Sequence, residues 1–215
     1  TAFIAVAIPG LLIAVVLSRF RSPAAAVALA AEPQPPFFAT FRMLLKNRTY
    51  GYLVVLGGVF SMTIFGPIAF LPAFFVRSHG LPMGTVGAYS GLAIGLGMAV
   101  GVMVGGALAD RLARGGAERP HWLCAIAILV AGLAFAAALL LANPWWAFGA
   151  VFVASATGSI ASPIIAAAVQ NESPPALRAT AAALGTLAVS LAGIGLAPLL
   201  IGVLSDALTP TYGQD

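Results

Sequence analysis

The sequence predicts an all-α polytopic membrane protein, and three observations carry that prediction. Of the 215 residues, 61% are hydrophobic and only 7% are charged, whereas about a quarter of the residues in a soluble domain are charged. The apolar residues fall into blocks of roughly 20, the length that crosses a ~30 Å hydrocarbon core. The strict alternation of β-barrel strands is absent, so helices are expected to satisfy the backbone in lipid.

Six apolar segments are long enough to be spanning helices. They cover residues 2–18, 51–76, 84–109, 122–142, 146–169 and 179–204. The first segment could be a signal peptide, but Arg19 and Arg21 follow its apolar run instead of preceding it. We therefore expect residues 2–18 to be a transmembrane helix in a chain truncated at its N-terminus.

Basic residues alternate between the connections that join these segments. Nine of the ten Lys and Arg residues would lie on one side of the membrane, namely Arg19, Arg21, Arg42, Lys46, Arg48, Arg111, Arg114, Arg119 and Arg178. Arg77 would lie on the other side. By the positive-inside rule, the side with nine is predicted to be cytoplasmic. The net charge of +4 is therefore a property of the loops and does not indicate nucleic-acid binding.

The connection over residues 19–50 has two parts. Residues 22–36 are rich in Ala and Pro and have no alternating pattern, which predicts a linker. Residues 37–48 favour a short amphipathic helix on the inner membrane surface, and the alternative is an early start of the second span. The apolar stripe of that helix would consist of Phe37, Phe41, Leu44 and Leu45.

Glycine and proline are unusually frequent inside the predicted spans. The third span carries two ladders of glycine at four-residue spacing, Gly87, Gly91 and Gly95, and then Gly97, Gly101 and Gly105. This spacing allows helix backbones to approach closely in lipid, and a seam that slides during transport is the alternative reading. Prolines remove a backbone donor and tend to kink helices. They occur at Pro67, Pro72, Pro163 and Pro198.

No Asp, Glu, Lys, Arg or His lies in the middle of a predicted span, so the candidates for a substrate cavity are hydroxyl and aromatic side chains. They are Phe60, Ser61, Phe65, Tyr89, Ser155, Thr157, Ser159, Ser162, Thr186 and Ser190. Each hydroxyl could instead bond to its own helix backbone. A cavity lined by hydroxyl groups and rings would suit an amphipathic or lipid-like solute better than an ion.

Three ionisable residues follow the third span directly, in the stretch GGALADRLARGG. Asp110 precedes Arg114 by four residues, so the two could pair if the helix continues for one turn. The carboxylate could also stabilise the N-terminus of a neighbouring helix. Arg178, at the start of the last span, opposes the helix dipole and needs compensation. Topological anchoring alone would explain Arg178 equally well.

The segment from Gly106 to Arg114 resembles the G-x-L-x-D-R-x-G-R loop motif of the major facilitator superfamily. Ala113 replaces the glycine of the motif, as in the weaker second copy between the eighth and ninth helices. The six spans would then be the sixth to eleventh of an expected twelve. The resemblance implies that residues 1–18 are the last helix of an N-terminal bundle and 19–50 the cytoplasmic linker with its interfacial helix. Residues 51–215 would form a C-terminal bundle without its last helix.

Three further segments are similar to spinster-like transporters within that superfamily, namely Pro9–Leu12, Leu177–Leu184 and Gly193–Asp206. The resemblance implies alternating access, in which two bundles rock about a central site. Asp110 would then be a gate residue, together with Gly106, Arg111 and Arg114 of the loop motif. Arg178 would pair with the acidic residue of the loop motif in the absent half. It also implies a lipid-like substrate, proton coupling, contact with membrane lipid and with the missing N-terminal helices, and a bacterial inner membrane.

Other classes of function are less well supported by the residues. The two histidines, His79 and His121, would lie at opposite membrane faces, which argues against an enzyme with paired catalytic groups. The single cysteine, Cys124, excludes a cysteine-based metal site, and no cofactor is expected. A receptor or assembly subunit that does not transport is the alternative to a carrier.

Overall fold

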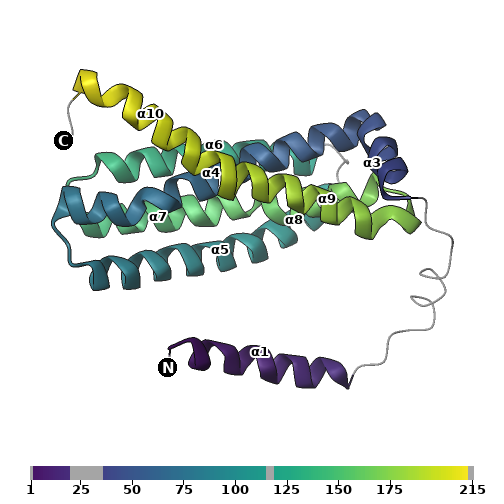
Figure 1. The fold of residues 1–215 in the computed structure, drawn as a ribbon, viewed down its shortest axis with the longest axis horizontal. Coiled ribbons are helices and arrows are strands. Elements are labelled where there is room, and N and C mark those ends of the chain that lie inside the picture. Colours follow the sequence, from purple (N-terminus) through teal and green to yellow (C-terminus); the bar gives the residue numbers. More distant parts are fainter. Residues whose placement is uncertain (1, 20–35, 115–118, 213–215) are drawn as a thin grey trace. The chain divides into compact units, whose positions relative to one another are not determined.

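The computed structural model describes residues 2–19, 36–114 and 119–212, and regular structure in these residues is helical (Figure 1). Five helical segments are long and apolar enough to cross a membrane: Arg48–His79, Met83–Ala113, Pro120–Leu140, Pro144–Asn171 and Pro175–Leu208. They match the last five predicted spans. The first predicted span forms helix α1 (Ala2–Ser18), which is 17 residues long.

The chain divides into two compact units, residues 1–36 and 37–215. The first contains α1, whose apolar side chains from Leu11 to Leu17 are exposed. The second contains the other helices of the described residues. Most of the predicted linker, residues 20–35, lies outside the described residues.

The predicted short amphipathic helix is a separate element. Helix α3 (Phe37–Lys46) ends before Asn47, whose side chain accepts hydrogen bonds from the backbone N–H groups of Thr49 and Tyr50 and so begins the next helix. An early start of the second span is therefore wrong. On the predicted stripe, Leu44 is buried and Phe41 is exposed. The position of α3 on a membrane surface stays a prediction.

In the bundle, each membrane-spanning segment is antiparallel to the next one along the chain. The elements of the bundle are α4 (Arg48–His79), α5 (Met83–Ala113), α6 (Arg119–Leu140), α7 (Pro144–Ser159), α8 (Ala161–Asn171), η1 (Pro175–Leu177), α9 (Arg178–Ser190), the π-helical η2 (Leu191–Leu196) and α10 (Ala197–Tyr212). One end holds Asp110 and His121 in a shared pocket, and the other end holds His79 beside Leu141. The predicted separation of the two histidines is confirmed.

Two of the predicted proline sites coincide with interruptions. A proline clashes with the carbonyl four residues earlier, and for Pro163 that residue is Ser159, where α7 ends. For Pro198 it is Ile194, inside η2. Helix α4 instead continues through Pro67 and Pro72. The chain therefore accommodates its prolines in two ways, by breaking a span or by continuing it.

Only one of the two glycine ladders is a packing seam. A Cβ atom on Gly97 would lie 2.7 Å from the Phe152 carbonyl oxygen, one on Gly105 would lie 2.6 Å from that of Ile160, and one on Gly101 would overlap that of Ala156. Helices α5 and α7 thus meet backbone to backbone. The other ladder, 87–91–95, is exposed and would meet no atom within 4 Å.

Candidate functional site

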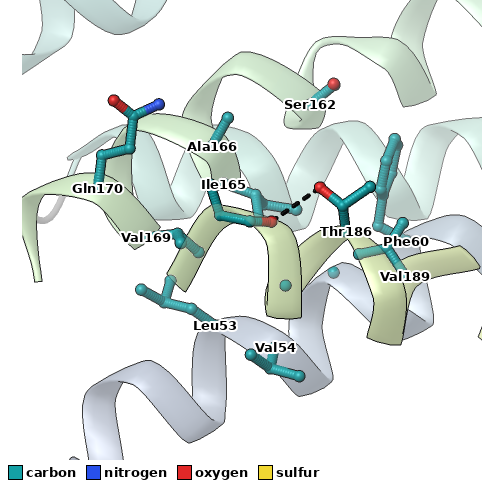
Figure 2. A pocket seen from close by; sticks show the side chains of 13 residues that line it. Leu53, Val54, Phe60, Ser162, Ile165, Ala166, Val169, Gln170, Thr186 and Val189 are labelled. Atoms are coloured by element: carbon teal, nitrogen blue, oxygen red, sulfur yellow. Dashed lines mark hydrogen bonds between the residues drawn. The ribbon is translucent and has the colours of Figure 1, made fainter. Parts of the chain in front are cut away.

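A pocket of about 180 Å³ lies between α4, α8 and α9 (Figure 2). Its walls are largely apolar, and none of its lining side chains is charged. Its lining consists of Leu53, Val54, Gly57, Phe60, Ser162, Ile165, Ala166, Val169, Gln170, Ala182, Gly185, Thr186 and Val189. Such a lining suits an uncharged, largely apolar group, because burying an unpaired charge among these side chains would be costly.

Two side-chain hydrogen bonds join α4 to α9 on either side of this pocket. The Tyr50 hydroxyl donates to the carbonyl oxygen of Ala181 at 2.9 Å, and the Ser61 hydroxyl donates to that of Val189 at 2.8 Å. The pocket residues of α4 fall between positions 50 and 61, and those of α9 begin at Ala182, next to the first bond, and end at Val189, the acceptor of the second. The two bonds therefore hold the helices at a defined separation along the length of the pocket.

Three polar side chains reach the pocket, and they differ in what they can offer a ligand. The Thr186 hydroxyl donates to the Ala182 carbonyl at 2.9 Å. It is therefore bonded to the backbone of its own helix, which was the alternative to a role in the cavity. The Ser162 hydroxyl and the Gln170 side-chain amide make no hydrogen bond to another described residue. In Figure 2 these two groups lie toward opposite ends of α8. Both are therefore free to bind a ligand.

Three of the predicted cavity residues, Phe60, Ser162 and Thr186, line the pocket. Ser61 does not line the pocket. Its hydroxyl donates to the carbonyl oxygen of Val189, which does line it. Ser190 is half-buried at the end of α9, outside the lining.

The remaining candidates lie elsewhere in the bundle. Ser155 and Ser159 are fully buried in the α5–α7 contact, opposite Gly97 and Gly101, and their hydroxyl groups have no partner among the described residues. Thr157 donates to the carbonyl of Val153 in its own helix.

Two aromatic candidates also lie outside the pocket. Phe65 packs against the apolar cluster around Phe75 and Phe148. Tyr89 is 44% exposed, with its ring 4.9 Å from that of Trp145. The structure therefore does not gather the ten predicted residues into one cavity.

Several pocket residues carry no signal in the sequence that would single them out. The predicted fifth span ends at residue 169, but α8 continues to Asn171 and brings Gln170 to the wall of the pocket. Gly57 and Gly185 do not belong to a regular ladder. Only the meeting of α4, α8 and α9 shows that these residues share a pocket.

The loop motif lies at the end of the bundle where α5, α6 and α8 meet. Helix α5 continues to Ala113, so Asp110 lies on its last turn and faces a pocket of about 420 Å³. His121, Asn171 and Glu172 line the same pocket. The helix continues far enough for Asp110 to approach Arg114, yet within the described part of the chain Asp110 makes no ion pair.

The rest of the motif is less enclosed. Arg111 and Arg114 are exposed. Gly106 is half-buried, and a Cβ atom there would meet no atom within 4 Å.

Arg178 is compensated within the bundle. Its Nε donates to the carbonyl oxygen of Gln170 at 3.1 Å, at the C-terminal end of α8. A cation is favourable there, because the last carbonyls of a helix carry partial negative charge. This contact offsets the unfavourable position of Arg178 at the start of α9.

Comparison with known proteins shows that this chain is similar to membrane transporters. An MFS-type efflux pump of Mycolicibacterium smegmatis is 32% identical over 173 residues, which are 77% of this chain and 39% of the pump. The crystal structure of a bacterial homologue of the human lysosomal transporter Spinster, inward-facing and unoccupied, has a TM-score of 0.74 at 25% identity. The match covers 97% of this chain and 45% of that one. The chain therefore spans less than half the length of either relative.

The predicted resemblance to spinster-like transporters is thus confirmed, and with it the prediction of a partial helix bundle of that fold. The chain is an integral, multi-pass membrane protein of a transporter family, not of an enzyme family. The sequence profile of the Major Facilitator Superfamily matches residues 1–206. The chain belongs to the Major Facilitator Superfamily.

Proposed function

We propose that the protein moves a small amphipathic or lipid-like solute across a bacterial inner membrane by alternating access. The pocket between α4, α8 and α9 would hold the apolar part of the solute. The observation that carries this proposal is the lining itself, in which apolar side chains surround two free polar groups, from Ser162 and Gln170, without any charge.

The small volume of the pocket indicates that it forms only part of the substrate site, with the rest supplied by another part of the protein. Its volume of about 180 Å³ is below the ~300–1,000 Å³ of ligand sites in general. A second wall would come from an N-terminal bundle of which residues 1–18 are the last helix. In this proposal residues 19–50 link the bundles on the cytoplasmic side, and residues 51–215 form most of the C-terminal one.

Proton coupling is the finer part of the proposal. An ionisable group inside a span is the usual carrier of a coupled proton, and the pocket lining has none. The coupling group would therefore be contributed by the N-terminal bundle. Collapsing the proton gradient across the membrane should then abolish uphill movement of the solute.

Asp110 is proposed as the gate residue. It faces a pocket at the predicted cytoplasmic end, and it has no ion pair with a described residue. A carboxylate in this position would stabilise a closed state by contacting a helix N-terminus of the partner bundle. Gly106, Arg111 and Arg114 would shape the same loop, and Arg178 would hold the start of α9 against the end of α8.

The test uses the full-length protein in proteoliposomes with an imposed proton gradient. Lysophosphatidylcholine and rhodamine 6G serve as amphiphilic probes, one lipid-like and one aromatic. We expect gradient-dependent movement of at least one probe, and we expect Asp110→Asn to lower its rate while the reconstituted amount stays the same. An unchanged rate in Asp110→Asn would remove the gating role. No protein-dependent flux of any amphiphile would favour a receptor or assembly subunit instead.

A further inference from the structure

Gly185 is an exception among the buried glycines of the bundle. The buried glycines in the described residues are Gly57, Gly66, Gly97, Gly101, Gly105, Gly158, Gly185 and Gly193. At seven of them, an added Cβ atom would approach a neighbouring atom to 3.1 Å or less, so close packing explains the missing side chain. At Gly185 the nearest atom would be Val169 Cγ1, at the ordinary van der Waals distance of 3.9 Å.

Packing therefore does not explain why position 185 is glycine. Glycine in a helix interior is less stable than alanine by up to about 1 kcal/mol, because the unfolded chain has more freedom to lose. Nor does Gly185 adopt a left-handed conformation, which would require glycine. What distinguishes the position is the space in front of it, because Gly185 lines the pocket between α4, α8 and α9.

We propose that Gly185 sets the size of the apolar group that this pocket accepts, together with the neighbouring Val169 of α8. The ligand class is the uncharged hydrocarbon portion of an amphiphile, because no lining side chain is charged. This inference rests on the proposed function. It adds to that function a single residue that selects substrates by the length or bulk of their hydrocarbon portion.

A different role for Gly185 makes a different prediction. If glycine served only to keep α9 flexible, Gly185→Ala would slow every substrate to the same degree. If glycine keeps space open, each added carbon atom removes room for hydrocarbon, and long chains lose more than short ones. The dependence on chain length therefore separates the two roles.

The experiment measures binding and flux on the same full-length protein. Lysophosphatidylcholines from decanoyl to stearoyl are titrated against nanodiscs, and their movement is followed in proteoliposomes. Gly185→Ala and Gly185→Val should progressively shift the preference toward shorter chains. For the valine variant we expect roughly a tenfold loss of affinity for stearoyl relative to decanoyl, equivalent to about two methylene groups withdrawn from burial.

Two further variants control for folding. Gly149→Ala makes the same chemical change at an exposed helical glycine with no atom within 4 Å, outside the pocket, and should leave the preference unchanged. Val169→Ala removes two methyl groups beside position 185. Combined with Gly185→Val, it should restore the preference for long chains over short ones. Relief of a folding defect between positions 169 and 185 would instead restore the binding of all chain lengths equally.

The outcomes for the two proposals are distinct. An unchanged order of preference in both Gly185 variants, an equal loss for all chains, or no saturable binding by the wild type would overturn the role of Gly185. A shifted order of binding without any movement of the probes would support Gly185 as the size-setting residue and contradict transport of these amphiphiles. If the wild type moves the probes and neither variant shifts the chain-length preference, transport is supported and the size-setting role of Gly185 is contradicted.

Discussion

The contact between α5 and α7 and the contact between α4 and α9 join similarly apolar helices in different ways. In the first, Gly97, Gly101 and Gly105 bring the helix backbones together, and a Cβ atom at any of them would collide with a carbonyl oxygen. In the second, hydroxyl groups of Tyr50 and Ser61 reach across to backbone carbonyls. Backbone contact leaves no room for a solute, whereas helices joined through side chains leave a pocket between them.

The two contacts also treat polar groups differently. The buried hydroxyls of Ser155 and Ser159 in the α5–α7 contact have no hydrogen-bond partner in the described residues. In the α4–α9 contact the single hydrogen of the Ser61 hydroxyl is shared between two acceptors, the carbonyl oxygens of Gly58 and Val189. We infer that shape holds the first contact and that directed hydrogen bonds hold the second. Substitutions in the two contacts should therefore have effects of different size.

The largest effect is expected for Gly101→Ala. The new Cβ atom would overlap the backbone carbonyl of Ala156, which cannot turn away as a flexible side chain could, so the two helices must separate. Overpacking of this kind costs about 1–3 kcal/mol or more. The full-length protein in detergent should show a clearly lower thermal unfolding midpoint. Gly91→Ala, on the open ladder of the same helix, should leave the midpoint nearly unchanged, and equal effects would contradict the difference between the ladders.

A smaller effect is expected for Ser61→Ala. This change removes the hydrogen bond to Val189 but adds no atoms, and the net contribution of such a bond is about 1 kcal/mol. The same unfolding measurement should show a modest decrease in the midpoint. A decrease as large as that of Gly101→Ala would mean that the α4–α9 contact is no more adaptable than the α5–α7 contact.

The sequence was sufficient to predict the helices and their antiparallel order. In lipid every backbone group needs a partner within the protein, so hydrophobic length and loop charge alone located the spans. Pro163 and Pro198 each lie four residues after a site where one of the last two spans is interrupted, whereas α4 continues through Pro67 and Pro72. Proline positions alone therefore did not predict which spans are interrupted. The spans themselves depend on local sequence, and local sequence predicted them.

The neighbours of each helix face could not be predicted in the same way. Both glycine ladders of α5 have the same spacing, and only the arrangement of α7 decides which one is packed. The hydroxyls of Ser155 and Ser162 are equally polar in the sequence, but one lies in a helix contact and the other in the pocket. Gln170 and Gly185 line the same pocket because three separate helices meet there, which no local pattern encodes.

Thiol labelling at Ser162 tests most directly whether substrate occupies the pocket between α4, α8 and α9. Ser162→Cys is nearly isosteric and places a thiol in the lining, whereas the native Cys124 is fully buried. The variant and its parent are treated with a maleimide in proteoliposomes, with and without lysophosphatidylcholine. Labelling should stop flux in the variant alone, and the lipid should slow the labelling. Complete labelling of the introduced thiol with unchanged flux would show that the substrate passes elsewhere.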